Sequence, residues 1–216
     1  EFSIVKTTDG SGLVNIGHGL NSEPKFILAK LTNTGQDWYV YHYGMGHDRY
    51  MTLNSSGAQL SYSGLWWTTD TYFSYLQTQG DNIYYCWSES DTQSFGSYTG
   101  NGNTSGNGPR VELGFRPDFL MVKASSTVSG WRIYDTSRNP SSPFENRLYA
   151  DDSNLESVNA SQFVTYDDTG FNVEANGSAS TYNVSGETYL YAAFAGSQDA
   201  TTLTLTDNTD LSDFLI

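Results

Sequence analysis

The stretch PKFILAK at residues 24–30 returns as PDFLMVK at residues 117–123, shifted by 93 residues. The same shift aligns WYVY at 38–41 with WRIY at 131–134. Further along, the shift becomes 98. Near the ends of the two copies, YYCW at 84–87 is similar to LYAAF at 190–194. An internal repeat of this length predicts two tandem modules of similar structure. Matched single positions are Phe2 with Phe95, Arg49 with Arg147, Ser55 with Ser153, and Phe73 with Phe171.

The repeat and the composition together predict an all-β fold, with two tandem antiparallel β-sandwich modules that resemble jelly rolls. Short runs of strand-forming residues alternate with turn residues about every ten positions. The expected modules span residues 1–94 and 95–199, followed by a C-terminal strand or tail at 200–216. Expected strands lie at residues 2–6, 13–16, 25–30, 37–42, 49–53, 71–76 and 82–88, then at 95–98, 110–114, 118–123, 130–135, 147–150, 170–174 and 188–195, with one short helical turn within 151–162.

Positions kept in both copies are expected to hold the fold together. Residues 26–29 are apolar on both alternating faces, so this strand is predicted to be covered on both sides. Recurring large aromatic residues are predicted core anchors, and recurring basic residues are predicted to serve structural pairing with their stems buried. These pairs are Trp38 with Trp131, Trp87 with Phe194, Lys30 with Lys123, and Arg49 with Arg147.

The charge balance excludes several classes of partner. The net charge is −14, and only 10 residues are Lys or Arg. Binding to a phosphate backbone requires a basic patch, so no nucleic acid partner is expected. No apolar run is long enough to cross a bilayer, so no membrane insertion is expected. Cys86 is the only cysteine, so no disulfide can form within one chain.

Trp66 and Trp67 form the aromatic pair that the repeat does not explain, because the shift of 98 places them against Val164 and Thr165. Adjacent side chains on a strand point in opposite directions, so at least one ring is expected at the surface. An exposed aromatic ring suits a sugar face or a protein contact. Burial in a core or in an interface is the alternative interpretation. The predicted ligand-binding residues are Trp66, Trp67, Tyr62 and Tyr72.

No catalytic residue, cofactor or metal site is predicted, so the protein is not expected to be an enzyme. His18, His42 and His47 all lie in the first copy, but their spacing fits no compact zinc pattern. Calcium remains an open alternative, because loop carboxylates and carbonyl oxygens can bind it. A glycosidase needs one selected pair of carboxylates, and nothing in the sequence selects one. The clustered acids are Asp151 with Asp152, Asp167 with Asp168, and Asp207 with Asp210 and Asp213.

Several phrases resemble a repeat of bacteriophage tail-fibre and other virion proteins, especially those of marine and cyanobacterial phages. The resemblance covers nearly all of residues 1–199. The phrases are FSIV at 2–5, GHGL at 17–20, FGSYTGNG at 95–102, GFRP at 114–117, WRIYD at 131–135 and YLYAAFA at 189–195.

The resemblance implies a virion structural protein, located outside the host cell on the phage particle, in a tail fibre or similar appendage. The implied partners are other virion chains, and the implied assembly is a homo-oligomer with a trimer favoured. Non-covalent attachment to a host-surface glycan is the expected function. A capsid-decoration or tail-assembly module without a host ligand is the alternative, and a glycan depolymerase is a third, weaker interpretation.

Overall fold

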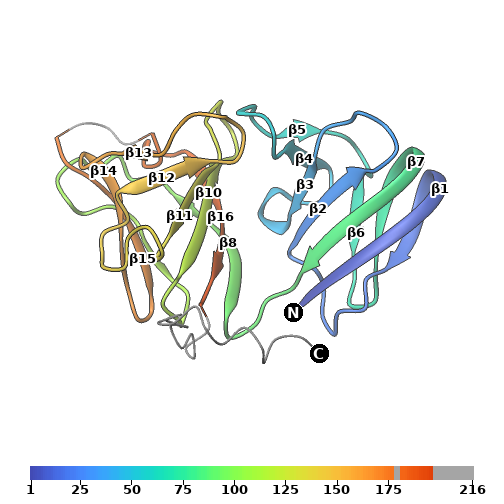
Figure 1. Ribbon diagram of the computed structural model, residues 1–216, viewed down its shortest axis with the longest axis horizontal. Coiled ribbons are helices and arrows are strands. Elements are labelled where there is room, and N and C mark those ends of the chain that lie inside the picture. The colour runs from blue at the N-terminus through green and yellow to red at the C-terminus, as the bar shows by residue number, and fades with distance from the viewer. Residues whose placement is uncertain (178–180, 197–216) are drawn as a thin grey trace, which may run out of the picture.

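The computed structural model describes residues 1–177 and 181–196, without the side chains of residues 9–11 and 76–79. The regular secondary structure of the described chain is almost entirely antiparallel strand, and the strands are grouped into two similar units that stand side by side in Figure 1. The predicted all-β class with two antiparallel modules is therefore confirmed. The tail expected at residues 200–216, with its three clustered acids, lies outside the described residues.

The first unit has one main sheet, with the strand order β1-β7-β2-β3-β4-β5, while β6 pairs with β7 beside this path. The strands β1 and β7 are each 16 residues long and pair with each other along their length. Their far halves, together with β6, pack over the main sheet as a second layer. The elements are β1 (Phe2–Gly17), β2 (Phe26–Leu31), β3 (Tyr39–His42), the 3-10 turn η1 (Tyr43–Met45), β4 (Arg49–Thr52), β5 (Leu60–Ser61), β6 (Trp66–Thr68) and β7 (Tyr72–Trp87).

The second unit forms a sandwich of two separate sheets. One has the order β13-β12-β11-β10-β16-β8, and the other has the order β14-β15-β9. A cluster of buried apolar and aromatic residues fills the space between them. The elements are β8 (Gln93–Thr99), β9 (Arg110–Glu112), β10 (Phe119–Ala124), β11 (Arg132–Asp135), β12 (Asn146–Tyr149), β13 (Ser157–Val158), β14 (Gln162–Asp167), β15 (Gly170–Ala175) and β16 (Thr188–Phe194).

In the first unit, the paired strands β1 and β7 pass from one layer to the other without a break. In the second unit, the corresponding pair of strands is interrupted. There, β8 and β9 together replace β1, and β15 and β16 together replace β7. The expected breaks between 2–6 and 13–16 and between 71–76 and 82–88 were therefore wrong for the first unit. Its turn-like residues are absorbed as irregularities in the β1/β7 pairing, between Thr7 and Gly10 and between Gly10 and Gly12.

The pairing of the opening strands corrects the alignment of the repeat at its start. Phe2 and Gln93 both lie opposite the last residue of the closing strand, which is β7 in one unit and β16 in the other. Phe95 is therefore the equivalent of Ile4, and not of Phe2. The two alignments differ by two residues, which leaves the side chains on the same face of the sheet.

The fourth strand needs a correction of one residue. The ladders of β3 with β4 and of β11 with β12 superpose with a shift of 97 on the fourth strand, in place of 98. Arg49 is thus equivalent to Asn146, and Tyr50 to Arg147. A slip of one residue moves every side chain to the opposite face, so Arg49 and Arg147 do not form a recurring structural pair.

Three hydrophobic clusters stabilise the described chain: one inside each unit and one between the two units. Strand β2 contributes to two of them, because Ile27 and Ala29 point into the first unit while Phe26 and Leu28 point toward the second. The prediction that this strand is covered on both faces is confirmed. The equivalent sheet faces of the two units therefore pack against each other, as their placement in Figure 1 also shows.

Specific contacts fix how the units meet. The indole nitrogen of Trp131 donates a hydrogen bond of 2.9 Å to the Thr52 carbonyl, and the rings of Phe26 and Phe95 stack with centroids 5.7 Å apart. Trp131 is buried, as predicted, whereas its counterpart Trp38 is only partly buried. A buried aromatic interface with directed hydrogen bonds holds the two units in one arrangement.

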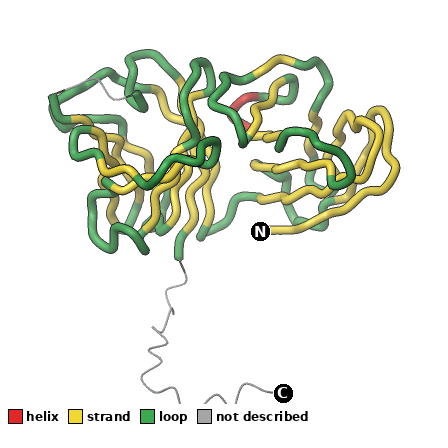
Figure 2. Tube along the Cα trace, turned by 45° about the horizontal axis from the view of Figure 1, so that its top comes forward, coloured by secondary structure: helices red, strands yellow, loops and turns green. Residues whose placement is uncertain are grey.

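The helical turn expected within residues 151–162 is wrong. Ser157 and Val158 instead form β13, and Gln162 begins β14. The pairing of β13 with β12 supplies backbone hydrogen bonds that override a weak local preference for helix. The only helix among the described residues is η1, red in Figure 2, and it is far too short to cross a membrane.

Candidate ligand-binding surface of the first unit

The three-residue strand β6 separates the two tryptophans that the sequence singles out. Its pattern is buried, exposed, buried, so Trp66 and Thr68 point inward and Trp67 points outward. The pairing of β6 and β14 with their neighbours confirms that Val164 and Thr165 are the equivalents in the second unit. The expected opposite orientation of the two rings is therefore correct.

Trp66 does not belong to a ligand-binding surface. Only 1% of its surface is exposed, and its ring lies 4.4 Å from that of Tyr75 and 5.5 Å from that of Tyr41. It fills the core of the first unit, where the second unit has the smaller Val164. The ligand-binding role predicted for Trp66 is withdrawn, and the alternative of burial in a core applies to this residue.

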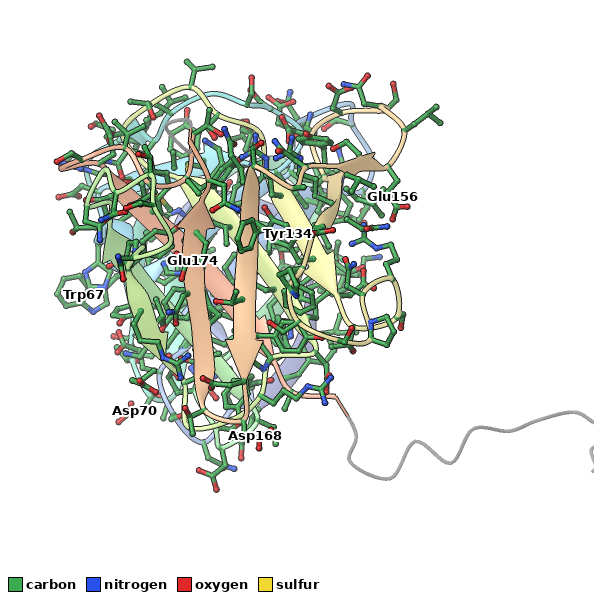
Figure 3. All side chains as sticks on the ribbon, turned by 90° about the vertical axis from the view of Figure 1, so that its left-hand side faces the viewer. Trp67, Asp70, Tyr134, Glu156, Asp168 and Glu174 are labelled. Carbon is green, nitrogen blue, oxygen red and sulfur yellow. The ribbon has the colours of Figure 1, made fainter. Side chains whose placement is uncertain are left out.

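Trp67 forms an exposed aromatic platform. Its side chain is 56% exposed, and Figure 3 shows the ring standing clear of the body of the protein. The ring of His47 lies 4.8 Å away and limits the directions in which the indole can turn. Across the same face, β6 and β7 place Ser74 opposite Trp67, and the Ser74 hydroxyl bonds Asn15 at 2.6 Å. The platform therefore has polar groups beside it.

Tyr72 and Tyr62 lie near this platform in different ways. Tyr72 is on the outward face of β7, two residues before Ser74, and is partly buried. Tyr62 is 49% exposed, and its backbone nitrogen donates to the Asp48 carbonyl at 2.8 Å, next to His47. The fold thus places Trp67, Tyr72 and Tyr62 in one region, although no ring contact links them.

A polar network supports the platform from below. The Thr68 hydroxyl has one proton and donates it to the Glu23 carboxylate, so it accepts hydrogen bonds from His47 Nε2 and the Tyr41 hydroxyl, both at 3.2 Å. Glu23 also accepts a 2.6 Å hydrogen bond from Lys25. Partial burial alone raises the pKa of Glu23, but the bonds from Lys25 and Thr68 lower it overall. Glu23 is therefore ionised at neutral pH.

The same network reaches the interface between the units. Lys25 Nζ lies 5.1 Å from the centroid of the Tyr43 ring, which stacks on His42 at 5.7 Å. The Gly44 nitrogen donates to His42 Nδ1, so the proton sits on Nε2 and bonds the Tyr191 carbonyl at 3.0 Å. Burial lowers the pKa of His42 to about 4. A chain of contacts thus leads from the exposed Trp67 to a neutral, buried histidine between the units.

The three histidines do not converge. His18 accepts from the Leu20 nitrogen and donates to the Thr69 carbonyl at 3.1 Å, while His42 and His47 serve the separate contacts described above. Within residues 1–177 and 181–196, no group of three or more His, Cys, Asp or Glu residues is arranged to hold a metal ion.

The described carboxylate clusters have structural partners. Asp167 accepts two hydrogen bonds from Arg110, at 2.8 and 2.9 Å, and these bonds hold its pKa far below the usual range. Asp151 accepts a 2.6 Å hydrogen bond from the Trp131 nitrogen, and Asp152 bonds Asn154. These acids stabilise turns and strand ends. The exposed Asp168, labelled in Figure 3, lies beside Asp167.

Sequence reasoning missed Glu23 and Lys25, although the repeat contains a signal for them. The shift of 93 places Arg116 and Asp118 at these positions, so the signs of the charges are exchanged. Arg116 lies 5.3 Å from the ring of Tyr166 and 3.8 Å from Asp118. An exchange of charge at matched positions marks a surface that the two units use differently.

Comparison with known proteins identifies a family. Residues 1–198 match a family model described as a domain of unknown function, DUF7483, and the chain belongs to this family. The matched segment includes both units together. No curated protein and no solved structure matches the chain.

Proposed function

We propose that the protein is a structural module of a bacteriophage virion, located in a tail fibre or similar appendage, and that its Trp67 surface binds a host-surface glycan without catalysis. The observation that carries the proposal is the exposed Trp67 ring, which lies beside His47 and on the same face as the hydrogen-bonded pair of Ser74 and Asn15. An aromatic face flanked by hydrogen-bonding groups matches a sugar, which has an apolar face and hydroxyl edges.

Two further features support binding at the Trp67 surface: the groups around the ring are fixed, and the second unit has no equivalent ring. The hydrogen bonds from His47 through Thr68 to Glu23 fix the groups around the ring, and a fixed surface loses little conformational entropy on binding. The second unit has Thr165 in place of Trp67, so the platform occurs once in the described chain. The virion location is supported by the resemblance of residues 1–199 to phage virion repeats.

Binding without catalysis is supported by the state of the acids near the ring. A glycosidase needs one carboxylic acid with a raised pKa to protonate the leaving group. The pKa of Glu23 is shifted in the opposite direction, because partial burial is outweighed by bonds from Lys25 and Thr68. Glu23 is thus suited to accept hydrogen bonds from sugar hydroxyls.

A single aromatic platform gives weak affinity, so the proposal includes several copies of the chain in the assembled virion. Linking copies multiplies weak contacts, often by about a hundredfold or more in avidity when the geometry allows joint binding. We propose a homo-oligomer, with a trimer as the favoured state, among other virion chains. Sedimentation equilibrium of the full chain tests this state directly.

The decisive experiment compares Trp67→Ala with Leu155→Ala, which removes an even more exposed apolar side chain from the second unit. On an array of host-envelope glycans, we expect the wild type and Leu155→Ala to bind and Trp67→Ala to lose about tenfold or more in affinity. Equal binding by all three proteins would overturn the glycan proposal. Release of new reducing ends from a bound glycan would contradict binding without catalysis.

The second candidate function is virion assembly without a host ligand. It is favoured by Phe2 and Ile4, which are 50% and 56% exposed on the outward face of β1. Strand β1 is also the edge of its sheet, and an exposed apolar edge is a site where another chain can pair. A double Phe2→Ser, Ile4→Ser variant that lost self-association but kept glycan binding would assign this face to assembly.

A further inference from the structure

A pair of arginines in the second unit replaces a pair of tyrosines in the first. The strand ladders place Arg132 at the position of Tyr39 and Arg147 at the position of Tyr50. The rings of Tyr39 and Tyr50 pack with centroids 5.5 Å apart. The second unit therefore has two positive charges where the first has a neutral aromatic pair.

The two guanidinium groups flank one aromatic ring. Arg132 and Arg147 lie 5.7 Å and 5.9 Å from the centroid of Tyr149, which pairs with Arg132 across β11 and β12. Arg132 also lies 3.6 Å from the Tyr182 ring and donates a 2.9 Å hydrogen bond to Thr181. The guanidinium of Arg132 is thus held in a defined orientation before any ligand arrives.

Neither arginine has an acidic partner among the described residues. The ion pairs there involve Arg110, Arg116 and Arg138 but not Arg132 or Arg147. The Nε of Arg132 and one terminal nitrogen of Arg147 are buried without a hydrogen-bond partner. An unsatisfied buried donor on a charged group is unfavourable, and two such groups close together repel each other.

The carboxylates in this region are engaged elsewhere. Asp135 forms an ion pair with Arg138 at 2.6 Å, and Asp151 accepts a hydrogen bond from the backbone nitrogen of Trp131. Glu187 accepts a hydrogen bond from the Ser126 hydroxyl. In a chain with a net charge of −14, positive charge left unpaired at this place favours an anionic ligand over accidental surface charge.

Arg132 also lines a hollow of about 330 Å³. Its wall includes Thr127, Ser129 and Thr181, which carry hydroxyl groups, and the apolar Val184. Glu187 also lines it, and its carboxylate accepts a hydrogen bond from the Ser126 hydroxyl. A volume of this order accommodates a small ligand, and hydroxyl groups around a fixed guanidinium suit a polar ligand with one acidic group. The loop that carries Thr181 and Tyr182 has no counterpart in the first unit, because β7 runs through that position without interruption.

The behaviour of Tyr149 agrees with a positive local potential. Partial burial raises the pKa of its hydroxyl, but the hydrogen bond with Ser157 and the charges of Arg147 and Arg132 lower it overall. Ser157 also accepts a 2.9 Å hydrogen bond from Arg147. A bound anion would be stabilised by the same two charges.

We propose that Arg132, with Arg147 behind Tyr149, forms a binding site in the second unit for the carboxylate of an acidic sugar. Arg132 is the residue that contacts the ligand, because it lines the hollow, and Arg147 acts through its charge. The carboxylate accepts hydrogen bonds from the Arg132 fork, while the sugar hydroxyls meet Thr127, Ser129 and Thr181. This site is separate from the Trp67 surface and does not depend on the function proposed for that surface.

The test uses a tetrasaccharide that ends in glucuronate and the matched tetrasaccharide that ends in glucose. Titration calorimetry at about 150 mM salt screens the remote acidic charges, since the Debye length is then about 8 Å. We expect binding of the glucuronate probe alone. We expect Arg132→Gln to weaken it about tenfold or more, and Arg147→Gln to weaken it about threefold.

Two further variants keep the test decisive. Arg132→Lys retains the charge without the planar fork, so an intermediate loss is expected if both matter. Leu13→Ala, at an exposed position of the first unit outside both proposed sites, is expected to bind the glucuronate probe as tightly as the wild type. Equal affinity for the two probes would overturn the proposal. So would unchanged binding by a folded Arg132→Gln variant, or inorganic phosphate bound as tightly as the glucuronate probe.

Discussion

The two units share one scaffold, but they differ in how the chain joins the layers of each sandwich. In the first unit β1 and β7 pass from one layer to the other without a break. In the second, β8 ends at Thr99 before β9 begins at Arg110, and β15 ends at Ala175 before β16 begins at Thr188. The two connecting segments contact each other, because Asn101 and Asn183 exchange hydrogen bonds of 2.7 and 2.9 Å. The second interruption contributes Thr181 and Val184 to the wall of the hollow beside Arg132, so the difference in topology is also a difference in chemistry.

The two units also use equivalent sheet faces unequally. Phe95 is 1% exposed in the interface, whereas its equivalent Ile4 is on the open part of the face. Trp131 is buried and Trp38 is partly exposed. Other pairs show the reverse, because Met51 of the first unit is 1% exposed and its equivalent Leu148 is 37% exposed. The faces therefore meet with an offset, and each unit covers a different part of the other.

The largest expected effect tests this unequal coverage at one repeat position. Trp131→Ala should lower the free energy of unfolding by about 3–5 kcal/mol, because it leaves a cavity and an unbonded Thr52 carbonyl in the interface. Trp38→Ala should lower it by only about 1 kcal/mol, because its ring is partly solvated already. Denaturant unfolding of both variants measures the difference. Equal losses would contradict the offset between the faces.

The next effect concerns the connecting segment between β8 and β9 in the second unit. A Cβ atom added at Gly108 would lie 1.4 Å from the Val173 carbonyl oxygen, a backbone atom that cannot rotate away. Gly108→Ala should therefore lower the free energy of unfolding by about 3 kcal/mol or more. Gly35→Ala is the matched control, because nothing lies within 4 Å of its added Cβ. If both variants unfolded at the wild-type denaturant concentration, the close approach would be wrong.

Much of the scaffold could be predicted from the sequence, because the repeat and the alternation of residues 26–29 depend on local patterns. The continuity of β1 could not, since Asp9-Gly10 has the composition of a turn while long-range pairing with β7 decides its structure. The misalignment of the fourth strand by one residue had the same cause, because hydrogen-bonded strand pairing fixes the register and sequence similarity does not.

The candidate sites were predictable in part. The opposite orientation of Trp66 and Trp67 follows from strand geometry, but the sequence alone does not say which ring faces the core. Arg132 was hidden because its significance depends on the register of β11 with β12 and on the distant loop that carries Tyr182. Such a site is assembled by tertiary contacts, so no local sequence motif predicts it.

A smaller effect is the pH dependence of stability that the buried His42 contributes. His42 has a folded pKa of about 4, lowered by burial, against about 6.5 when unfolded. As pH falls from 6.5 to 4, the unfolded chain binds a proton that the folded chain does not, so stability falls by about 3 kcal/mol in this window. A His42→Gln variant should lack this part of the pH dependence in chemical unfolding. An unchanged slope would contradict the buried, neutral state of His42.

The smallest effect contrasts two lysines at one repeat position. Burial lowers the pKa of Lys123 to about 8, and among the described residues its ammonium group bonds only the backbone carbonyls of Ala124 and Ser56. Lys123→Met should raise stability by about 1 kcal/mol at pH 7, because it removes a buried charge without an acidic partner. The gain should shrink as pH rises from 8 to 10.5, where the folded lysine is neutral and the unfolded one is not. Lys30→Met, at the partly buried counterpart, should change stability by less than about 0.5 kcal/mol at either pH. Thermal unfolding at pH 7 and pH 10 distinguishes the two, and a loss of stability in Lys123→Met would mean that its carbonyl bonds outweigh the burial of its charge.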